Sequence, residues 1–282
     1  MYFHNYNMKN FYRNKKVNEE KNRCIKNKGH LNLDSIQNLN ITNLKNIVYI
    51  NLKDVCNYEI SPLEEKDIHI EITEELINNL NINYKETKLY KYYKEYSPDN
   101  LAEVYKVKYS KDDKNKILTT LSPHTIFEPW IHNYPVPIEN YSHSGLFGLK
   151  SDSFIKNEYN RTKNVILSIK ENGYSPNHFF DKRNGLITFQ LYKYKNKYKI
   201  YVIAGNHRTV VLKSMGHYIV PAIFQQNHFL KPRNKFNNML YYPNKSYQKI
   251  IDYDNIDNWA GVKSGFISKD EASKMFLSFF AN

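Results

Sequence analysis

Short apolar runs recur along the chain, and their spacing predicts strands alternating with helices. The run Ile47–Ile50 has the length and the β-branched content of a strand. The alternation over Ile68–Ile72 fits either a second strand or the entrance to a helix over Thr73–Leu80, and the sequence leaves both open. Such a mixture of elements predicts an α/β fold.

A stretch rich in Lys and Tyr, residues 89–105, carries apolar positions at helical spacing. The step Ser97-Pro98-Asp99 interrupts it, so we expect two helices, the second with an N-cap just before Leu101. Four prolines then fall within residues 122–139. This density predicts an ordered connector and a boundary between an N-terminal region and the part that follows.

The second half of the chain gives clearer signals for single elements. Residues 159–172 predict a helix that Gly173 ends, and two strands follow over Ile187–Tyr192 and Tyr198–Ala204, joined as a hairpin. Residues 268–271 read Ser-Lys-Asp-Glu, which is a capping-box pattern, and apolar residues at helical spacing come after it. We expect this last helix to serve packing.

The 282 residues offer ample material for a core, and the signals divide them into four parts. These are a basic N-terminal segment that forms a flexible tail or a short surface helix (1–33), an N-terminal α/β region (34–120), a central domain (121–225) and a C-terminal extension ending in a helix (226–282).

The chain is strongly basic, yet the charge says little about a partner. Lys and Arg number 41 against 28 Asp and Glu, which gives a formal net charge of +13. Only six of these basic residues are Arg, and the rest are Lys. Asn, Ile and Tyr are abundant as well, and like Lys they have A/T-rich codons. Because proteins that read bases rely on arginine forks, DNA is kept as an alternative partner but is not favoured.

Cysteine usage and hydropathy exclude several classes of protein. Cys24 and Cys56 match no metal or disulfide pattern, and the histidines lack the spacing of a zinc site. No segment has the apolar run of a signal peptide or the ~20 apolar residues of a membrane helix. We therefore expect a cytoplasmic protein with no membrane partner and no metal held by its own side chains.

The most specific chemical signal is the turn Ala-Gly-Asn-His-Arg at 204–208, which lies between a predicted strand and a predicted helix. Gly205 can take a positive φ and lets a ligand approach the backbone, and Asn206 is a good N-cap residue. His207 and Arg208 stand in the first helical turn, where cations oppose the helix dipole unless an anion is bound. We expect a phosphate site here, with His207 and Arg208 as the candidate catalytic residues. The candidate phosphate-binding residues are Gly205, Asn206, His207, Arg208 and Thr209.

Residues 160–224 resemble the ParB/sulfiredoxin superfamily in the order and spacing of several elements. The matching features are the helix end at 168–173, Tyr-Ser-Pro at 174–176, the hairpin, the Gly-Asn-His-Arg turn, the helix end at 212–216 with Gly216 as its stop, and Val-Pro-Ala at 220–222. The resemblance implies a ParB/sulfiredoxin-like domain with a small mixed sheet and flanking helices. It also implies a nucleotide ligand, ATP or CTP with Mg²⁺, because members carry a Gly-x-His-Arg or Gly-x-Arg-Arg box that wraps nucleotide phosphates.

The departures from that family narrow the expected activity. Sulfiredoxins carry a cysteine where this chain has Asn206, so reduction of a sulfinic acid is not expected. The branch that phosphorylates free serine has an acidic residue where this chain has Ala204, so a general base would come from elsewhere. Partition proteins follow the box with a helix-turn-helix domain, and nothing after Phe224 predicts one.

Further site candidates follow from position. The loop 142–151 is not a phosphate-binding P-loop, because Leu149 separates the glycine from the lysine, but it precedes the helix that carries Arg161. His143 and Arg161 are therefore additional candidates for nucleotide binding. The candidate general bases are Glu128, Glu158, Glu171 and Asp181.

Three functions remain open at this stage. The first is a nucleotide-binding protein that acts as a phosphotransferase or a nucleotide hydrolase. The second is a non-enzymatic or nuclease-like DNA-binding relative that uses the basic segment 1–33. The third is a regulatory or structural protein with a vestigial pocket, linked to surface-polysaccharide synthesis.

Overall fold

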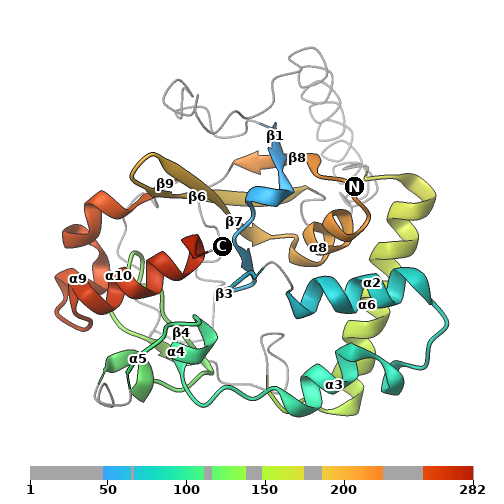
Figure 1. The fold of residues 1–282 in the computed structure, drawn as a ribbon, viewed down its shortest axis with the longest axis horizontal. Coiled ribbons are helices and arrows are strands. Elements are labelled where there is room, and N and C mark those ends of the chain that lie inside the picture. Colours follow the sequence, from blue (N-terminus) through green and yellow to red (C-terminus); the bar gives the residue numbers. More distant parts are fainter. Residues whose placement is uncertain are drawn as a thin grey trace, which may run out of the picture.

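A mixed sheet with helices on both sides organises the chain in its computed structural model (Figure 1). The structure describes residues 47–64, 67–110, 116–137, 148–174, 186–224 and 250–281. The expectations for the basic segment 1–33 fall outside these ranges.

The sheet has five strands in the order β1-β8-β6-β7, with β9 also paired to β6. β1 runs antiparallel to β8 and β6 antiparallel to β7, whereas β8 and β9 lie parallel to successive halves of β6. The strands are β1 (Ile47–Asn51), β6 (Ile187–Tyr194), β7 (Lys197–Ala204), β8 (Ile219–Phe224) and β9 (Ile250–Asp252). Two small antiparallel ladders lie outside this sheet: β2 (Asn57–Tyr58) with β3 (Ser61–Pro62), and β4 (Thr125–Ile126) with β5 (Val136–Pro137).

Helices supply most of the remaining described structure. The α-helices are α2 (Ile68–Asn78), α3 (Lys88–Glu95), α4 (Leu101–Val104), α5 (Ile117–Thr120), α6 (Asp152–Asn172), α8 (Asn206–Ser214), α9 (Ala260–Lys263) and α10 (Lys269–Leu277). The 3₁₀ turns are η2 (Leu52–Asp54), η3 (Tyr84–Glu86), η6 (Tyr253–Asn258) and η7 (Ser278–Phe280).

Each face of the sheet buries its own apolar cluster, because side chains alternate between the faces of a strand. Phe189 and Leu191 of β6 pack with Ile200 and Val202 of β7 against α2, α3, α6 and α8. On the other face Tyr192 and its neighbours pack against α4, α5, α9 and α10. In Figure 1 the first group of helices lies to the right of the sheet, and α9 and α10 lie to its left.

Several predicted elements are confirmed, and local capping explains where they begin and end. The segment at Ile68 is helical, because Asp67 caps α2 by accepting a bond from the His69 amide at 2.9 Å. The break before Leu101 is present, with Asn100 as the N-cap of α4. Gly173 ends α6 at φ +66°, although this helix begins at Asp152, earlier than predicted.

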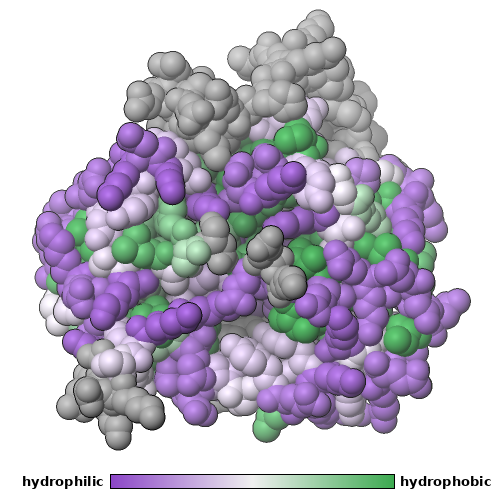
Figure 2. All heavy atoms as spheres, in the orientation of Figure 1, coloured by the Kyte–Doolittle hydropathy of each residue, from purple (hydrophilic) through white to green (hydrophobic). Residues whose placement is uncertain are grey.

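The predicted α/β class is confirmed as a mixed α/β arrangement with a small mixed sheet. Strands of this one sheet come from three of the sequence-defined parts, since β1, β6 to β8, and β9 fall in different parts. Hydrophilic residues cover most of the described surface in Figure 2, broken by small apolar patches. No helix among the described residues is long and apolar enough to cross a bilayer.

Candidate functional site

The turn singled out by the sequence lies where β7 passes into α8. Gly205 has φ +99°, a left-handed conformation that favours glycine. A Cβ built on Gly205 would lie 3.2 Å from Nη2 of Arg208 and 3.2 Å from Cα of Ile187. The positive φ expected at Gly205 is confirmed, and the guanidinium of Arg208 lies against this bare backbone.

The expectation that Asn206 caps the helix is wrong. Gly205 itself occupies the N-cap position, so the chain is already helical at Asn206, and no side chain caps the helix. The Oδ1 atom of Asn206 is enclosed and has no hydrogen-bond partner among the described residues. Thr209 is buried, and its hydroxyl donates to the carbonyl of Gly205 at 3.1 Å, so this side chain stabilises the turn from inside.

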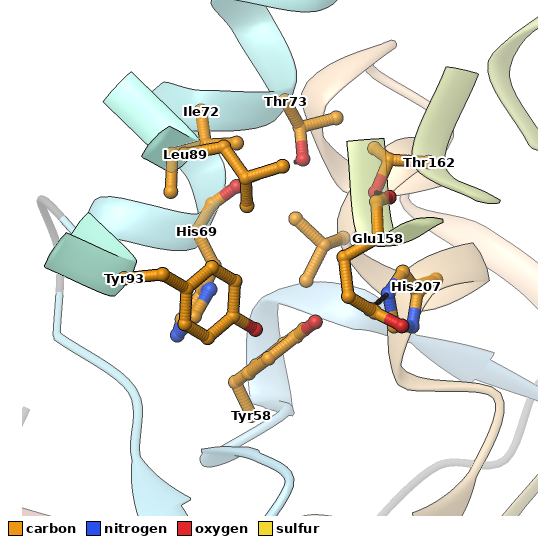
Figure 3. Close-up of a pocket in the computed structure, with 10 residues that line it drawn as sticks. Tyr58, His69, Ile72, Thr73, Leu89, Tyr93, Glu158, Thr162 and His207 are labelled. Atoms are coloured by element: carbon orange, nitrogen blue, oxygen red, sulfur yellow. Dashed lines mark hydrogen bonds and ion pairs between the residues drawn. The ribbon is translucent and has the colours of Figure 1, made fainter. Parts of the chain in front are cut away.

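His207 faces a carboxylate from α6. Its Nε2 lies 2.8 Å from Oε2 of Glu158, and Nη1 of Arg161 lies 3.4 Å from the other oxygen, Oε1 (Figure 3 draws the His207 pair). The side chains of His207 and Glu158 are only 11% and 13% exposed, whereas that of Arg161 is 63% exposed. Both oxygens of Glu158 are therefore engaged, one by a shielded partner and one by a solvent-facing partner.

Burial and neighbouring charges shift the pKa values of Glu158 and Arg208. Burial opposes the ionisation of Glu158, but the hydrogen bond and charge of His207, together with Arg161, outweigh it and hold the pKa of Glu158 below its ordinary value. Burial lowers the pKa of Arg208, with a further contribution from the positive charge of Arg161. The positive charge of Arg161 is therefore felt at Arg208, beside the start of α8.

A small pocket opens at the His207–Glu158 pair, with about 330 Å³ of atom-free space when the open solvent at its mouth is counted. Its walls are aromatic, apolar and hydroxyl-bearing side chains, and Figure 3 shows the hydroxyls of Tyr58 and Tyr93 directed toward the side of Glu158. His69 stacks on Tyr58 with ring centroids 3.8 Å apart, and burial lowers its pKa to about 3, so its ring is neutral. The lining residues are Tyr58, His69, Ile72, Thr73, Leu89, Tyr93, Glu158, Thr162, His207 and Val210.

A second carboxyl group, that of Glu59, was not predicted from the sequence; this residue directly follows the pocket-lining Tyr58 but is not itself among the lining residues. It follows Tyr58 in the turn between β2 and β3 and has φ +52°, uncommon for a residue with a side chain. Burial raises its pKa to about 7, and the negative charge of Glu158 adds to this effect, while Arg161 and Lys150 oppose it. No motif marks this residue, because its strands are two residues long and its neighbours come from distant parts of the chain.

The remaining candidate residues lie at different distances from the predicted turn. It brings Arg161 and Glu158 to the predicted turn, and both stand on α6. Glu171 is exposed at the far end of α6, and Glu128 lies in the other core, where it accepts a bond from the Tyr201 hydroxyl at 2.6 Å. His143 and Asp181 lie outside the described residues.

Within the described part of the chain, no three His, Cys, Asp or Glu residues are grouped closely enough to hold a metal ion. Comparison of the chain with protein-family models, with curated proteins and with solved structures gave no match. The resemblance to the ParB/sulfiredoxin superfamily therefore stays a prediction, and the site's own geometry carries the interpretation.

Proposed function

We propose that the protein binds a nucleotide by its phosphates at the start of α8, and that it transfers or hydrolyses the terminal phosphate. The observation that carries this proposal is that Arg208 lies against the left-handed turn at Gly205, while His207 and Arg161 bind the same carboxylate, Glu158. His207 and Arg208 come from the predicted turn itself, while Arg161 arrives from a separate helix.

Electrostatics favours an anion at this place. The first-turn amides of a helix lack intrahelical acceptors, and the helix dipole adds a partial positive charge there. The first turn of α8 holds no acidic residue, and the repulsion between Arg161 and Arg208 would be relieved by a ligand that carries negative charge.

The exposed arginine can move to a ligand at little cost. The contact of Arg161 with Glu158 is long, at 3.4 Å, and a surface ion pair of this kind is worth about 0–1 kcal/mol. A phosphate offers a bidentate partner for the same guanidinium. His207 would stay with Glu158 and place its ring at the edge of the bound phosphate, while Arg208 would neutralise the charge that develops during transfer.

The nucleotide, rather than a simple phosphate, is proposed from the resemblance of residues 160–224 to the ParB/sulfiredoxin superfamily. ATP or CTP with Mg²⁺ is the expected ligand. The described residues offer no metal cluster of their own, so the ion would enter with the phosphates. Of the three candidate bases within the described residues, Glu128, Glu158 and Glu171, it is Glu158 that contacts the predicted turn.

Thermal unfolding with ATP, ADP, CTP and GTP in the presence of Mg²⁺ tests the proposal. A ligand at ~100 times its dissociation constant stabilises the folded state by about 2.7 kcal/mol, which is a readable rise in Tm. We expect this rise in the wild-type protein and in the control Lys213→Ala, which removes a charge from the last turn of the same helix. The variant Arg208→Ala should lose most of the rise.

Two outcomes would contradict the proposal. If no nucleotide raises Tm, the site does not bind nucleotides. If a nucleotide raises Tm equally in Arg208→Ala, binding occurs elsewhere. A rise with duplex DNA alone, lost at high salt, would favour the DNA-binding alternative.

A further inference from the structure

Building on the function proposed above, we propose that His207 is the general base of the reaction and that Glu158 positions it. The proton would come from the hydroxyl group that accepts the phosphate. This acceptor is water, or an alcohol whose hydroxyl reaches the pocket at the His207–Glu158 pair. The inference rests on the proposed function, because it requires a phosphate bound at the start of α8.

Two packed helices bring His207 and Glu158 together. Glu158 stands in the first half of the 21-residue helix α6, and His207 stands in the first turn of α8, which packs on α6. Nε2 of His207 lies 2.8 Å from Oε2 of Glu158, a distance typical of a hydrogen bond to an ionised group. With side chains only 11% and 13% exposed, both partners are shielded from competing water. The bond therefore fixes the orientation of the imidazole ring.

The charge of Glu158 decides which nitrogen of His207 carries a proton. The hydrogen bond and charge of His207, with Arg161, hold the pKa of Glu158 below its ordinary value, so this carboxylate is ionised at neutral pH. An ionised carboxylate only accepts hydrogen bonds, so Nε2–H of His207 is the donor. When the ring is neutral, its other nitrogen, Nδ1, then carries the lone pair that can take up a proton.

The pocket gives the acceptor oxygen a place beside this ring. His207 and Glu158 both line it, together with side chains from α2, α3 and β2. Figure 3 shows the hydroxyls of Tyr58 and Tyr93 directed toward the side of Glu158, and the ring centroids of Tyr58 and His207 lie 6.0 Å apart. Because a hydroxyl can both donate and accept, these walls can hold an oxygen that still carries its proton.

The size of the pocket limits the acceptor. Sites that enclose a whole small molecule measure about 300–1,000 Å³, whereas the 330 Å³ of this pocket already counts the open solvent at its mouth. A water molecule takes up only about 30 Å³. The apolar side chains of Ile72, Leu89 and Val210 form part of the wall and offer no hydrogen bond. The pocket therefore suits water or the end of a slender alcohol.

The proposed step transfers one phosphoryl group and one proton. The acceptor oxygen attacks the terminal phosphorus of the bound nucleoside triphosphate and forms a new P–O bond, while the bond from that phosphorus to the bridging oxygen breaks. The hydroxyl proton passes to Nδ1 of His207, and the carboxylate of Glu158 stabilises the imidazolium that forms. The nucleoside diphosphate leaves with the electron pair of the broken bond.

The release of nucleoside diphosphate measures this step, since transfer to water and transfer to an alcohol both produce it. The assay uses Mg²⁺ with ATP or CTP, in buffer alone and with added glycerol. We expect Glu158→Gln to lower the rate about 100-fold, because a glutamine amide can donate to Nε2 and so favours the wrong tautomer of the ring. Its nucleotide affinity should stay within about threefold of wild type, because Glu158 holds the base and not the phosphates.

Chemical rescue distinguishes a base from a side chain that only supports the fold. His207→Ala should lower the rate at least about 100-fold, and added imidazole should restore part of it by filling the space that the ring leaves. Glu74→Gln, the same change at an exposed position of α2, should leave the rate unchanged. Inorganic phosphate as the only new phosphate product would identify water as the acceptor, whereas glycerol phosphate would identify an alcohol.

Each contrary outcome decides a different claim. A Glu158→Gln variant that keeps its rate within about threefold overturns the positioning role. A His207→Ala variant that binds nucleotide overturns the role of the base if it keeps its rate, or if imidazole restores none of the lost rate. Nucleotide binding by the wild type without any release of diphosphate overturns both roles. Failure of the wild type to bind any nucleotide overturns the proposed function itself.

Discussion

Replacing Glu128 with glutamine should remove a pH-dependent loss of folding stability. Glu128 is bonded to Tyr201, in the apolar cluster that also contains Tyr192. Glu128 is 5% exposed, and its carboxyl group accepts one hydrogen bond, from Tyr201. Burial raises its pKa to about 7, with the Tyr201 bond acting weakly in the opposite direction. Its backbone N–H is bonded to Nδ1 of His132, so the carboxyl position is fixed by its own main chain. A glutamine keeps the shape and the oxygen that accepts from Tyr201 but cannot ionise.

The sign and size of this effect follow from the linkage between protonation of Glu128 and folding. A carboxyl whose pKa is higher in the folded state stabilises the fold at low pH and loses that contribution as pH rises from its ordinary value toward the folded value. The rise from 4.5 to about 7 is about 2.5 pH units, worth about 3 kcal/mol at ~1.36 kcal/mol per unit. Glu128→Gln should therefore be nearly neutral at pH 4.5 and more stable than wild type by about 3 kcal/mol above pH 7.5.

Urea unfolding of both proteins across this pH range measures the effect as a difference in the free energy of unfolding. Glu59 has a raised pKa too, and its contribution cancels in the difference because both proteins retain it. A glutamine variant whose stability relative to wild type does not rise with pH would refute the reasoning, since it would mean that folding does not raise the pKa of Glu128.

Two further substitutions test the geometry of the turn 204–208 and of the strand that leads into it. Gly205→Ala should destabilise the protein by about 1–3 kcal/mol in urea unfolding, because alanine is strained at φ +99° and its Cβ would crowd Ile187. Gly265→Ala, at φ +74° in open space, should cost less, and equal losses would argue against the crowding. Asn57→Ala should cost about 2–4 kcal/mol by leaving the backbone N–H and carbonyl of Val202 unpaired in the core, and a loss below about 0.5 kcal/mol would contradict this role.

The parts of the fold that sequence could predict are those set by local chemistry. Gly173 and Gly216 end their helices at positive φ, and Ser268 caps α10 by accepting from the Glu271 amide. These signals depend on residues only a few positions apart. The predicted N-cap at Asn206 was wrong, because Gly205, in the left-handed conformation, occupies the N-cap position instead.

Only part of the candidate site could be predicted from the sequence. The turn 204–208 stands out in the sequence because its residues are consecutive. Glu158 and Arg161 were named as candidates, but their arrangement beside the turn could not be predicted, since Glu158 lies 49 residues before His207 and meets it only through the packing of α6 on α8. No sequence pattern indicates Glu59, because an isolated glutamate in a short turn has no periodicity. Its raised pKa comes from burial and from charges that are distant in the sequence.

Calorimetric titration with ATP and with CTP in the presence of Mg²⁺ measures whether the start of α8 binds nucleotide phosphates, as we propose. We expect one of the two nucleotides to bind the wild type and Lys213→Ala with equal affinity. Binding to Arg208→Ala should be at least about tenfold weaker, corresponding to about 1.4 kcal/mol, the lower end expected for charge-assisted bonds. Equal affinity in all three proteins, or no binding to the wild type, would contradict this proposal.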